Sequence, residues 1–184
     1  NTDISFEILG KLDSNYVVYK NIRWKHVLGI YNNNMRLVEN QRIKFIPDKT
    51  FNIDFIVYPR YFYMIYQYQK NSIVHCMAVK MNEQCEKVGE PVQLDTTKIG
   101  VLADNKIYTT TFSEDRQKIL VYKMHLKNDK LTIATKLFDN NLKILDQTRN
   151  TYDFDDRRDV FSELFVTNDG EVFFAKAAKF RPRE

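Results

Sequence analysis

The sequence LFDNNLKIL at residues 137–145 has two looser copies, IYNNNMRLV at residues 30–38 and KMNEQCEKV at residues 80–88. Each copy places Asn or Asp directly after a large apolar residue and returns to apolar residues a few positions later. Asn and Asp bond their own backbone and tolerate the left-handed conformation, so this pattern between apolar runs predicts a β-hairpin turn. With Tyr31, Met81 and Phe138 taken as equivalent, the copies are spaced by 50 and 57 residues.

A second series of turns alternates with the first. Its members are LDSN (12–15), VYPR (57–60), SEDR (113–116) and TNDG (167–170). With Asn15, Arg60, Arg116 and Gly170 taken as equivalent, the spacings are 45, 56 and 54 residues. Two kinds of turn alternating in phase predict a tandem repeat of about 50 residues, a period typical of solenoids, propellers and arrays.

Each repeat is predicted to contain four strands, because its apolar runs are rich in Val, Ile, Tyr, Phe and Thr. The second strand of a repeat is apolar on both faces, as in YFYMIYQY at 61–68, whereas the fourth is mostly polar. We therefore expect an all-β fold of tandem four-stranded antiparallel meanders whose inner strands are covered on both faces. We predict a single all-β domain of about 3.5 repeats, with boundaries at 1–47, 48–98, 99–155 and 156–184. We expect this domain to be a segment of a longer protein.

A stack of such sheets with a polar outer strand resembles the β-propeller repeat proteins, notably uncharacterised propeller-like segments of bacterial envelope or secreted proteins. The chain carries neither a Trp-Asp blade signature nor the paired glycines of kelch repeats, so the resemblance is to the architecture. It implies a partial propeller and a secreted or cell-envelope location. A β-sandwich or a meander barrel is the alternative fold.

Composition narrows the classes of function. The chain is 43% hydrophobic and 14% aromatic, which is typical of a folded domain. Its net charge is +4, but 28 cations are mixed with 24 anions along the whole length, so we expect no nucleic-acid partner. No apolar run approaches the roughly 20 residues of a membrane-spanning helix, and no signal peptide is visible.

No motif of known chemistry is present. The three histidines, His26, His75 and His125, lack a metal-ligand spacing, so we expect no metal site and no cofactor. Cys76 and Cys85 lie in the predicted third and fourth strands of one hairpin, about 13 Å apart at the expected register, and are predicted to be reduced. Phosphate-binding loops and nucleophile motifs are missing from the sequence.

Candidate binding residues come from the connections opposite the two series of turns. These connections contain the only Trp and the acidic run DFDDRRD at 153–159. That run indicates either a carboxylate or calcium site or, because arginines interrupt it, self-neutralising surface pairs. Since binding residues concentrate on loops of a rigid scaffold, the predicted contact residues are Arg23, Trp24, Asp155, Arg157 and Arg158. Trp24 could instead pack against a neighbouring repeat.

Two functions remain open. The first is a non-catalytic binding or scaffolding module that recognises protein or glycan through this loop face. The alternative is a propeller-type carbohydrate-active enzyme that uses carboxylates of the first strands, for which the sequence offers Asp54 and Glu163. The open ends of an incomplete stack would expose apolar strand faces, which predicts self-association or further repeats that cover them.

Overall fold

The computed structural model describes residues 4–99, 106–155 and 157–179, and in these residues every regular element is a β-strand. The chain divides into two compact units, Asn1–Lys106 and Ile107–Glu184, and each is described by itself. None of the described elements is a helix that could cross a membrane.

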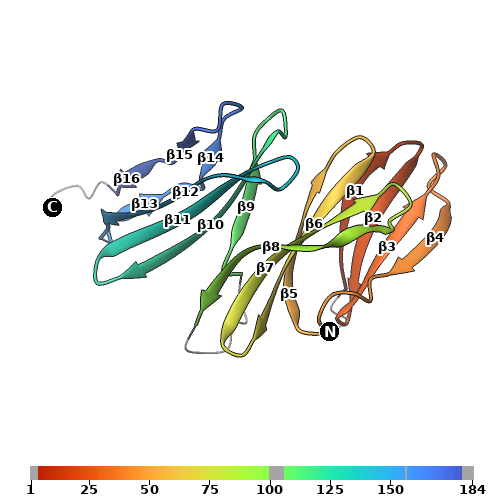
Figure 1. Cartoon of the computed structure of the whole chain (residues 1–184), viewed down its shortest axis with the longest axis horizontal. Helices are drawn as coiled ribbons and strands as arrows, with labels where there is room; N and C mark the ends of the chain where they lie inside the picture. The colour runs from red at the N-terminus through yellow and green to blue at the C-terminus, as the bar shows by residue number, and fades with distance from the viewer. Residues whose placement is uncertain (1–3, 100–105, 156, 180–184) are drawn as a thin grey trace. The chain divides into compact units, whose positions relative to one another are not determined.

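The first unit contains two four-stranded antiparallel meanders (Figure 1). The strands of the first are β1 (Ile4–Leu12), β2 (Asn15–Ile22), β3 (Lys25–Tyr31) and β4 (Leu37–Arg42). Those of the second are β5 (Thr50–Val57), β6 (Tyr61–Lys70), β7 (Ile73–Asn82) and β8 (Lys87–Lys98). In both sheets the strands lie in sequence order, so every neighbour is joined by a hairpin.

The second unit contains one complete meander and a partial repeat of four short strands. The complete sheet consists of β9 (Thr109–Phe112), β10 (Lys118–Lys127), β11 (Lys130–Asp139) and β12 (Ile144–Asp153). The partial repeat consists of β13 (Asp159–Phe161), β14 (Phe165–Val166), β15 (Val172–Phe173) and β16 (Lys176–Ala178). β13 pairs with β16 and β14 with β15, and the Ser162 N–H donates to the Ala175 carbonyl oxygen between them at 2.9 Å, so together they form one interrupted hairpin.

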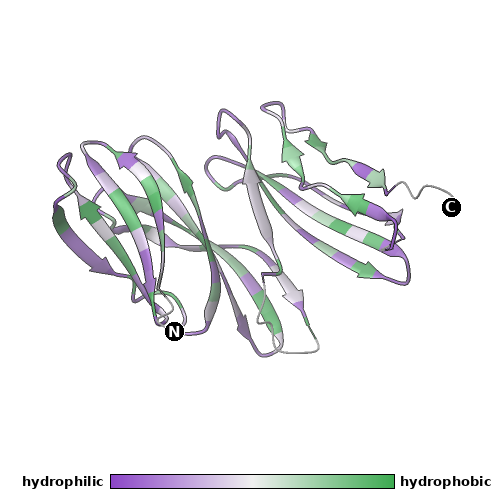
Figure 2. Ribbon diagram, turned by 180° about the vertical axis from the view of Figure 1, so that it is seen from behind, coloured by the Kyte–Doolittle hydropathy of each residue, from purple (hydrophilic) through white to green (hydrophobic). Residues whose placement is uncertain are grey.

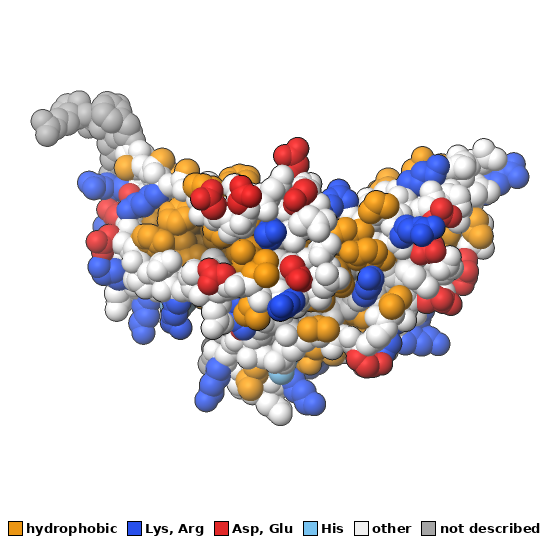
Figure 3. Space-filling view, turned by 45° about the horizontal axis from the view of Figure 1, so that its top comes forward, with side chains coloured by type: hydrophobic (Ala, Val, Ile, Leu, Met, Phe, Trp, Pro, Cys, Tyr) orange, Lys and Arg blue, Asp and Glu red, His pale blue; other side chains and the backbone are white. Residues whose placement is uncertain are grey.

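The prediction of an all-β fold built from tandem four-stranded antiparallel meanders is confirmed. All three four-stranded sheets are open, so the meander barrel is not observed among the described strands. Green and purple alternate along many strands in Figure 2, which is the two-residue period of a strand with one buried face. Cations and anions are interspersed over the face drawn in Figure 3, as their mixture along the sequence predicts.

The three copies of the first turn motif adopt one conformation. Asn32, Asn82 and Asp139 begin the turns, and in each the side-chain oxygen accepts the N–H groups two and four residues later at 2.8–3.1 Å. The fourth residue of each turn is left-handed: φ is 55° at Met35, 61° at Cys85 and 63° at Leu142. The side chain thus substitutes for a backbone acceptor, which explains why Asn or Asp recurs at this position.

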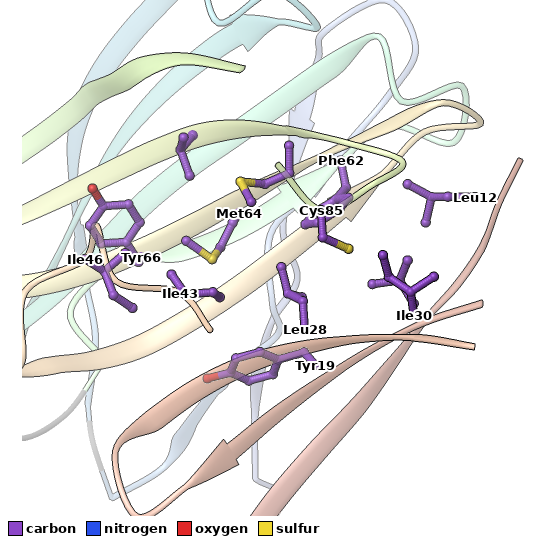
Figure 4. Packing of buried hydrophobic residues seen from close by; sticks show 13 residues of the cluster. Leu12, Tyr19, Leu28, Ile30, Ile43, Ile46, Phe62, Met64, Tyr66 and Cys85 are labelled. Atoms are coloured by element: carbon purple, nitrogen blue, oxygen red, sulfur yellow. The ribbon is translucent and has the colours of Figure 1, made fainter. Parts of the chain in front are cut away.

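The core of the first unit lies between its two sheets. Figure 4 shows Tyr19, Leu28 and Ile30 of the first sheet facing Phe62 and Met64 of the second. All five side chains are buried and belong to one cluster. Ile43 and Ile46, in the connection from β4 to β5, join the same cluster and hold that connection against the sheets.

The connections opposite the two series of turns, where the candidate binding residues were predicted, include three tight turns. The β2–β3, β6–β7 and β10–β11 connections are two-residue turns in which both residues are left-handed: Arg23–Trp24, Asn71–Ser72 and Asn128–Asp129. This is the type I′ geometry, whose twist matches that of the flanking strands. The connections from one repeat to the next are longer, for example residues 43–49 between β4 and β5.

The cysteines are reduced and buried, as predicted, but the expected register was wrong. Cys85 is not a strand residue paired with Lys80; it is the left-handed residue of the β7–β8 turn, and Lys80 pairs with Val88. Burial raises the pKa of the Cys85 thiol to about 12, and the negative charge of Glu39 adds to the effect. The thiol therefore stays protonated, as expected of a structural rather than a reactive cysteine.

Candidate functional site

Trp24 occupies an unusual position for a tryptophan. It is the second residue of the β2–β3 turn with φ of 66°, and Arg23 before it has φ of 50°. The Trp24 N–H donates to the Asn21 side-chain oxygen at 3.1 Å, which fixes the turn. Trp24 is exposed, with 67% of its surface accessible to solvent. A left-handed conformation disfavours bulky residues, so an exposed tryptophan held there is a candidate contact residue.

A groove of about 280 Å³ opens beside this turn. We call it the Trp24 groove. One side is formed by the start of the hairpin's second strand and the other by the connection from β4 to β5. Its lining residues are Trp24, Lys25, His26, Arg42, Ile43, Lys44, Ile46, Pro47 and Asp48. The Ile43 N–H donates to the His26 carbonyl oxygen at 2.9 Å, and this bond joins the two sides.

The Trp24 groove carries an excess of positive charge. Lys25, Arg42 and Lys44 line it and are exposed, against the single carboxylate of Asp48. Within the described parts of the chain, none of these three cations forms an ion pair. Elsewhere ion pairs do form, for example Lys176 with Asp159 at 2.8 Å and Lys87 with Glu90 at 2.7 Å.

His26 is the buried polar residue of the groove. Its Nδ1 lies 2.6 Å from the Tyr19 hydroxyl, whereas its Nε2 is buried and has no hydrogen-bond partner among the described residues. Burial lowers the pKa of His26 and, with the charge of Glu7, raises the pKa of Tyr19 to about 12. Both side chains are therefore neutral near pH 7, and with the phenol donating to Nδ1 the ring proton lies on Nε2.

The other predicted contact residues belong to the second unit. Asp155 pairs with Arg158 (Nε to Oδ2, 3.3 Å), and its other oxygen accepts the Arg157 N–H at 3.0 Å. Asp159 pairs with Lys176. Only the Asp155–Arg158 pair lies within the run, as the self-neutralising interpretation expects, whereas Asp153 and Asp159 pair with Lys130 and Lys176 outside it. Asp156 lies outside the described residues. Arg23 and Trp24 belong to the first unit, so the five predicted residues divide between the two units.

The carboxylates proposed for catalysis do not share a unit either. Asp54 lies in the first unit, where the Lys106 ammonium is 2.9 Å from its Oδ2, and Glu163 is an exposed residue of the second. The pKa of Glu7, on strand β1 of the other sheet of this unit, is raised by partial burial and, to a smaller extent, by the charge of Asp54. Sequence reasoning missed Glu7 as a partner of Asp54.

A second groove, of about 320 Å³, lies in the second unit. Its floor is apolar, with Leu120, Ile133 and Leu137, and residues of β12 and of the partial repeat form its walls. No group of three or more possible metal ligands occurs in the described residues. His75 is engaged with Gln93 at 3.1 Å and stacks on Tyr68, and His125 is exposed on β10.

Sequence reasoning found the Trp24 end of the groove but not its other residues. His26 was interpreted as an ordinary strand histidine. A two-residue turn at Arg23–Trp24 places Asn21 opposite His26. Tyr19 is two residues from Asn21 on the same strand, so its side chain lies on the same face of the sheet as His26. Recognising that turn would have predicted the Tyr19–His26 pair. Arg42 and Lys44 come from the connection between repeats and could be found only in the folded chain.

Comparison with known proteins adds no family: no protein-family model matches the chain, and no curated protein matches it significantly.

Proposed function

We propose that this chain is a non-catalytic binding module, built as a segment of a β-propeller-like stack, that recognises a glycan or protein through the Trp24 groove. One observation carries the proposal: an exposed indole is held in a disfavoured left-handed turn at the edge of a concave, cation-lined groove. Backbone strain retained at an exposed position favours a role in contact rather than in stability.

The size of the groove favours a glycan over a protein surface. At about 280 Å³ it is at the small end of the range for ligand pockets. A stable protein interface needs roughly 800 Å² from each partner, of which this groove would supply a small part. An indole presents a flat apolar face with one polar N–H, and such a surface suits the apolar face of a sugar ring.

A glycan array tests this function. The intact chain is expected to bind a restricted set of glycans, and Trp24→Ala is expected to lose them. Val38→Ala is the control, because Val38 is an apolar residue of the same unit that is 60% exposed and does not line the groove. Loss of binding in both variants, or in neither, would contradict a site at Trp24.

A carbohydrate-active enzyme is the second candidate. The observation in its favour is the pair Glu7 and Asp54: partial burial and the charge of Asp54 raise the pKa of Glu7, and two carboxyl groups with one of raised pKa are a pattern of glycosidase sites. Hydrolysis of the array-positive glycans, abolished by Glu7→Gln, would support it. Intact glycans after prolonged incubation would support the binding module.

We also propose that the chain self-associates through open apolar strand faces. Phe6 and Ile8 on β1 are 71% and 59% exposed, and Phe165 and Phe173 in the partial repeat are 61% and 54% exposed. Large exposed apolar side chains mark association sites or aggregation liabilities. Light scattering is expected to give a mass above 22.0 kDa that falls on dilution; a monomer at high concentration would reject the proposal. A cell-envelope or secreted location remains an expectation from the resemblance.

A further inference from the structure

We propose that the ligand of the Trp24 groove is an anionic sugar residue, one that carries a carboxylate or a sulfate, with its ring against the indole and its charged group near Arg42 and Lys44. This inference rests on the proposed binding function and adds the chemical class of the ligand. It follows from three properties of the groove: its charge, its unpartnered buried donor and its aromatic edge.

The first property is uncompensated charge. Lys25, Arg42 and Lys44 all line a groove of about 280 Å³ that has one carboxylate among its lining residues, and none of the three forms an ion pair with a described residue. Two cations elsewhere in the first unit do form ion pairs: Lys106 with Asp54 and Lys87 with Glu90. A cluster of unpaired cations raises the local potential and attracts anions, and guanidinium groups bind planar oxyanions through two parallel hydrogen bonds.

The second property is a buried donor without an acceptor. His26 is only 6% exposed and lines the groove, and its Nδ1 lies 2.6 Å from the Tyr19 hydroxyl. In the tautomer in which Nδ1 accepts from that hydroxyl, Nε2–H is a donor without an acceptor among the described residues. A buried unsatisfied donor destabilises a fold unless a bound group or an ordered water supplies an acceptor. An oxyanion in the groove supplies such an acceptor once the side chains that close off Nε2 shift aside, because Nε2 itself has almost no accessible surface.

The third property is the aromatic edge. Trp24 borders the same groove as the cations, so a bound group meets an apolar face and a positive charge together. A simple inorganic anion would use the charge and leave the indole unused. A neutral sugar would use the indole but form no ion pair with Arg42 or Lys44. A ring bearing a carboxylate or sulfate uses all of them.

Trp24 is the only tryptophan, so its fluorescence reports directly on the groove. The intact chain is titrated with four probes: a hexuronate oligomer, a sulfated oligosaccharide, a neutral glucose oligomer and sodium sulfate. At least one of the two acidic glycans is expected to change Trp24 emission saturably, with at least tenfold higher affinity than the neutral oligomer or sulfate, and to weaken as salt rises. Which acidic glycan binds tells carboxylate from sulfate.

Each other outcome has one meaning. Equal affinity for the neutral oligomer overturns the anionic class and leaves the proposed function standing. Equal affinity for sodium sulfate means an adventitious ion only and overturns the sugar. No change with any probe, together with an empty glycan array, overturns both the inference and the proposed function.

Two variants distinguish an effect of charge in the groove from an effect of net charge, and both retain Trp24 as the fluorescent reporter. Arg42→Gln and Lys44→Gln are each expected to weaken the acidic glycan about tenfold. Lys130→Gln removes the same charge from the second unit, where Lys130 pairs with Asp153, and is expected to leave affinity unchanged. An equal loss in all three variants would mean that net charge alone draws the ligand, and would overturn the site.

Discussion

Strands β6 and β10 hold equivalent places in their repeats, yet only β6 is covered along most of its length. On one face of β6, Phe62, Met64 and Tyr66 are buried against the first sheet. On the face of β10 that packs against the partial repeat, Leu120 and Tyr122 are buried, but Met124 and Leu126 are 44% and 42% exposed. Both faces consist of large apolar side chains, so the difference in burial comes from what lies over them.

A complete meander covers β6, whereas a broken hairpin covers β10. The strands of the partial repeat contain only two or three residues each, and they reach Leu120 and Tyr122 through Leu164 and Val166. The groove of about 320 Å³ beside β12 is the space that this hairpin leaves unfilled. Burial in a stack of sheets is therefore set by the neighbour, and the two units should respond differently to the same substitution.

The largest expected effect is in the covered strand. Met64→Ala should lower the free energy of unfolding by about 2–5 kcal/mol, because Met64 is fully buried and the change leaves a cavity. Met124→Ala, the same change on the exposed half of β10, should cost less than about 1 kcal/mol. Urea unfolding followed by circular dichroism measures both, and Trp24 fluorescence follows the first unit alone. Equal costs would mean that the cover over the two strands does not differ.

The next largest loss of stability is expected at the turn that begins with Asn82 in the first unit and with Asp139 in the second. Asp139→Ala and Asn82→Ala each remove a side-chain oxygen that accepts two backbone N–H groups. Each should cost about 1–2 kcal/mol, since a hydrogen bond contributes about 0.5–1.5 kcal/mol. Asp139→Asn keeps the acceptor and should cost less than about 0.5 kcal/mol. A large loss of stability from one substitution and none from the other would show that the turn does not stabilise the two units in the same way.

This turn also shows why so much of the fold could be predicted. Asn32, Asn82 and Asp139 act through local bonds, so the chemistry of the turn is written in adjacent residues. The strands between such turns follow from period and composition, which are local as well. Asn71–Ser72 and Asn128–Asp129 are typical of type I′ turns, and only the atypical Arg23–Trp24 pair concealed that the three connections are alike.

The groove could not be predicted in the same way. Lys44 meets the Trp24 turn because Ile43 and Ile46 anchor the connection from β4 to β5 in the core. That placement depends on the packing of two sheets, which no local pattern specifies. The break between β13 and β14 at residues 162–164 could not be predicted for a related reason. The residues on either side are apolar enough to form one continuous strand, but no complete sheet pairs with them.

A smaller effect, confined to acid pH, should separate the two units through their histidines. Burial lowers the pKa of His26, so the unfolded chain binds a proton there more readily than the folded one. The stabilising contribution of the neutral ring is complete above the unfolded pKa of about 6.5 and is lost as pH falls through that value toward the lower, folded one. His26→Gln should flatten this part of the pH–stability curve. His125→Gln, an exposed substitution on β10 of the second unit, is the control for the loss of an imidazole as such.

The smallest expected effect is a gain, and it tests the idea that the first unit gives up stability at its binding turn. Replacing Arg23–Trp24 by Asn-Gly supplies residues that favour the left-handed conformation, and it should stabilise the chain by about 1 kcal/mol while abolishing glycan binding. Asp129→Gly in the equivalent turn of the second unit should change stability by less than about 0.5 kcal/mol, because Asn128–Asp129 already suits the turn. Circular dichroism in urea measures both variants, since the first removes the only tryptophan. Destabilisation by the Asn-Gly replacement would mean that Trp24 packs for stability, and the strain argument for its role in binding would fail.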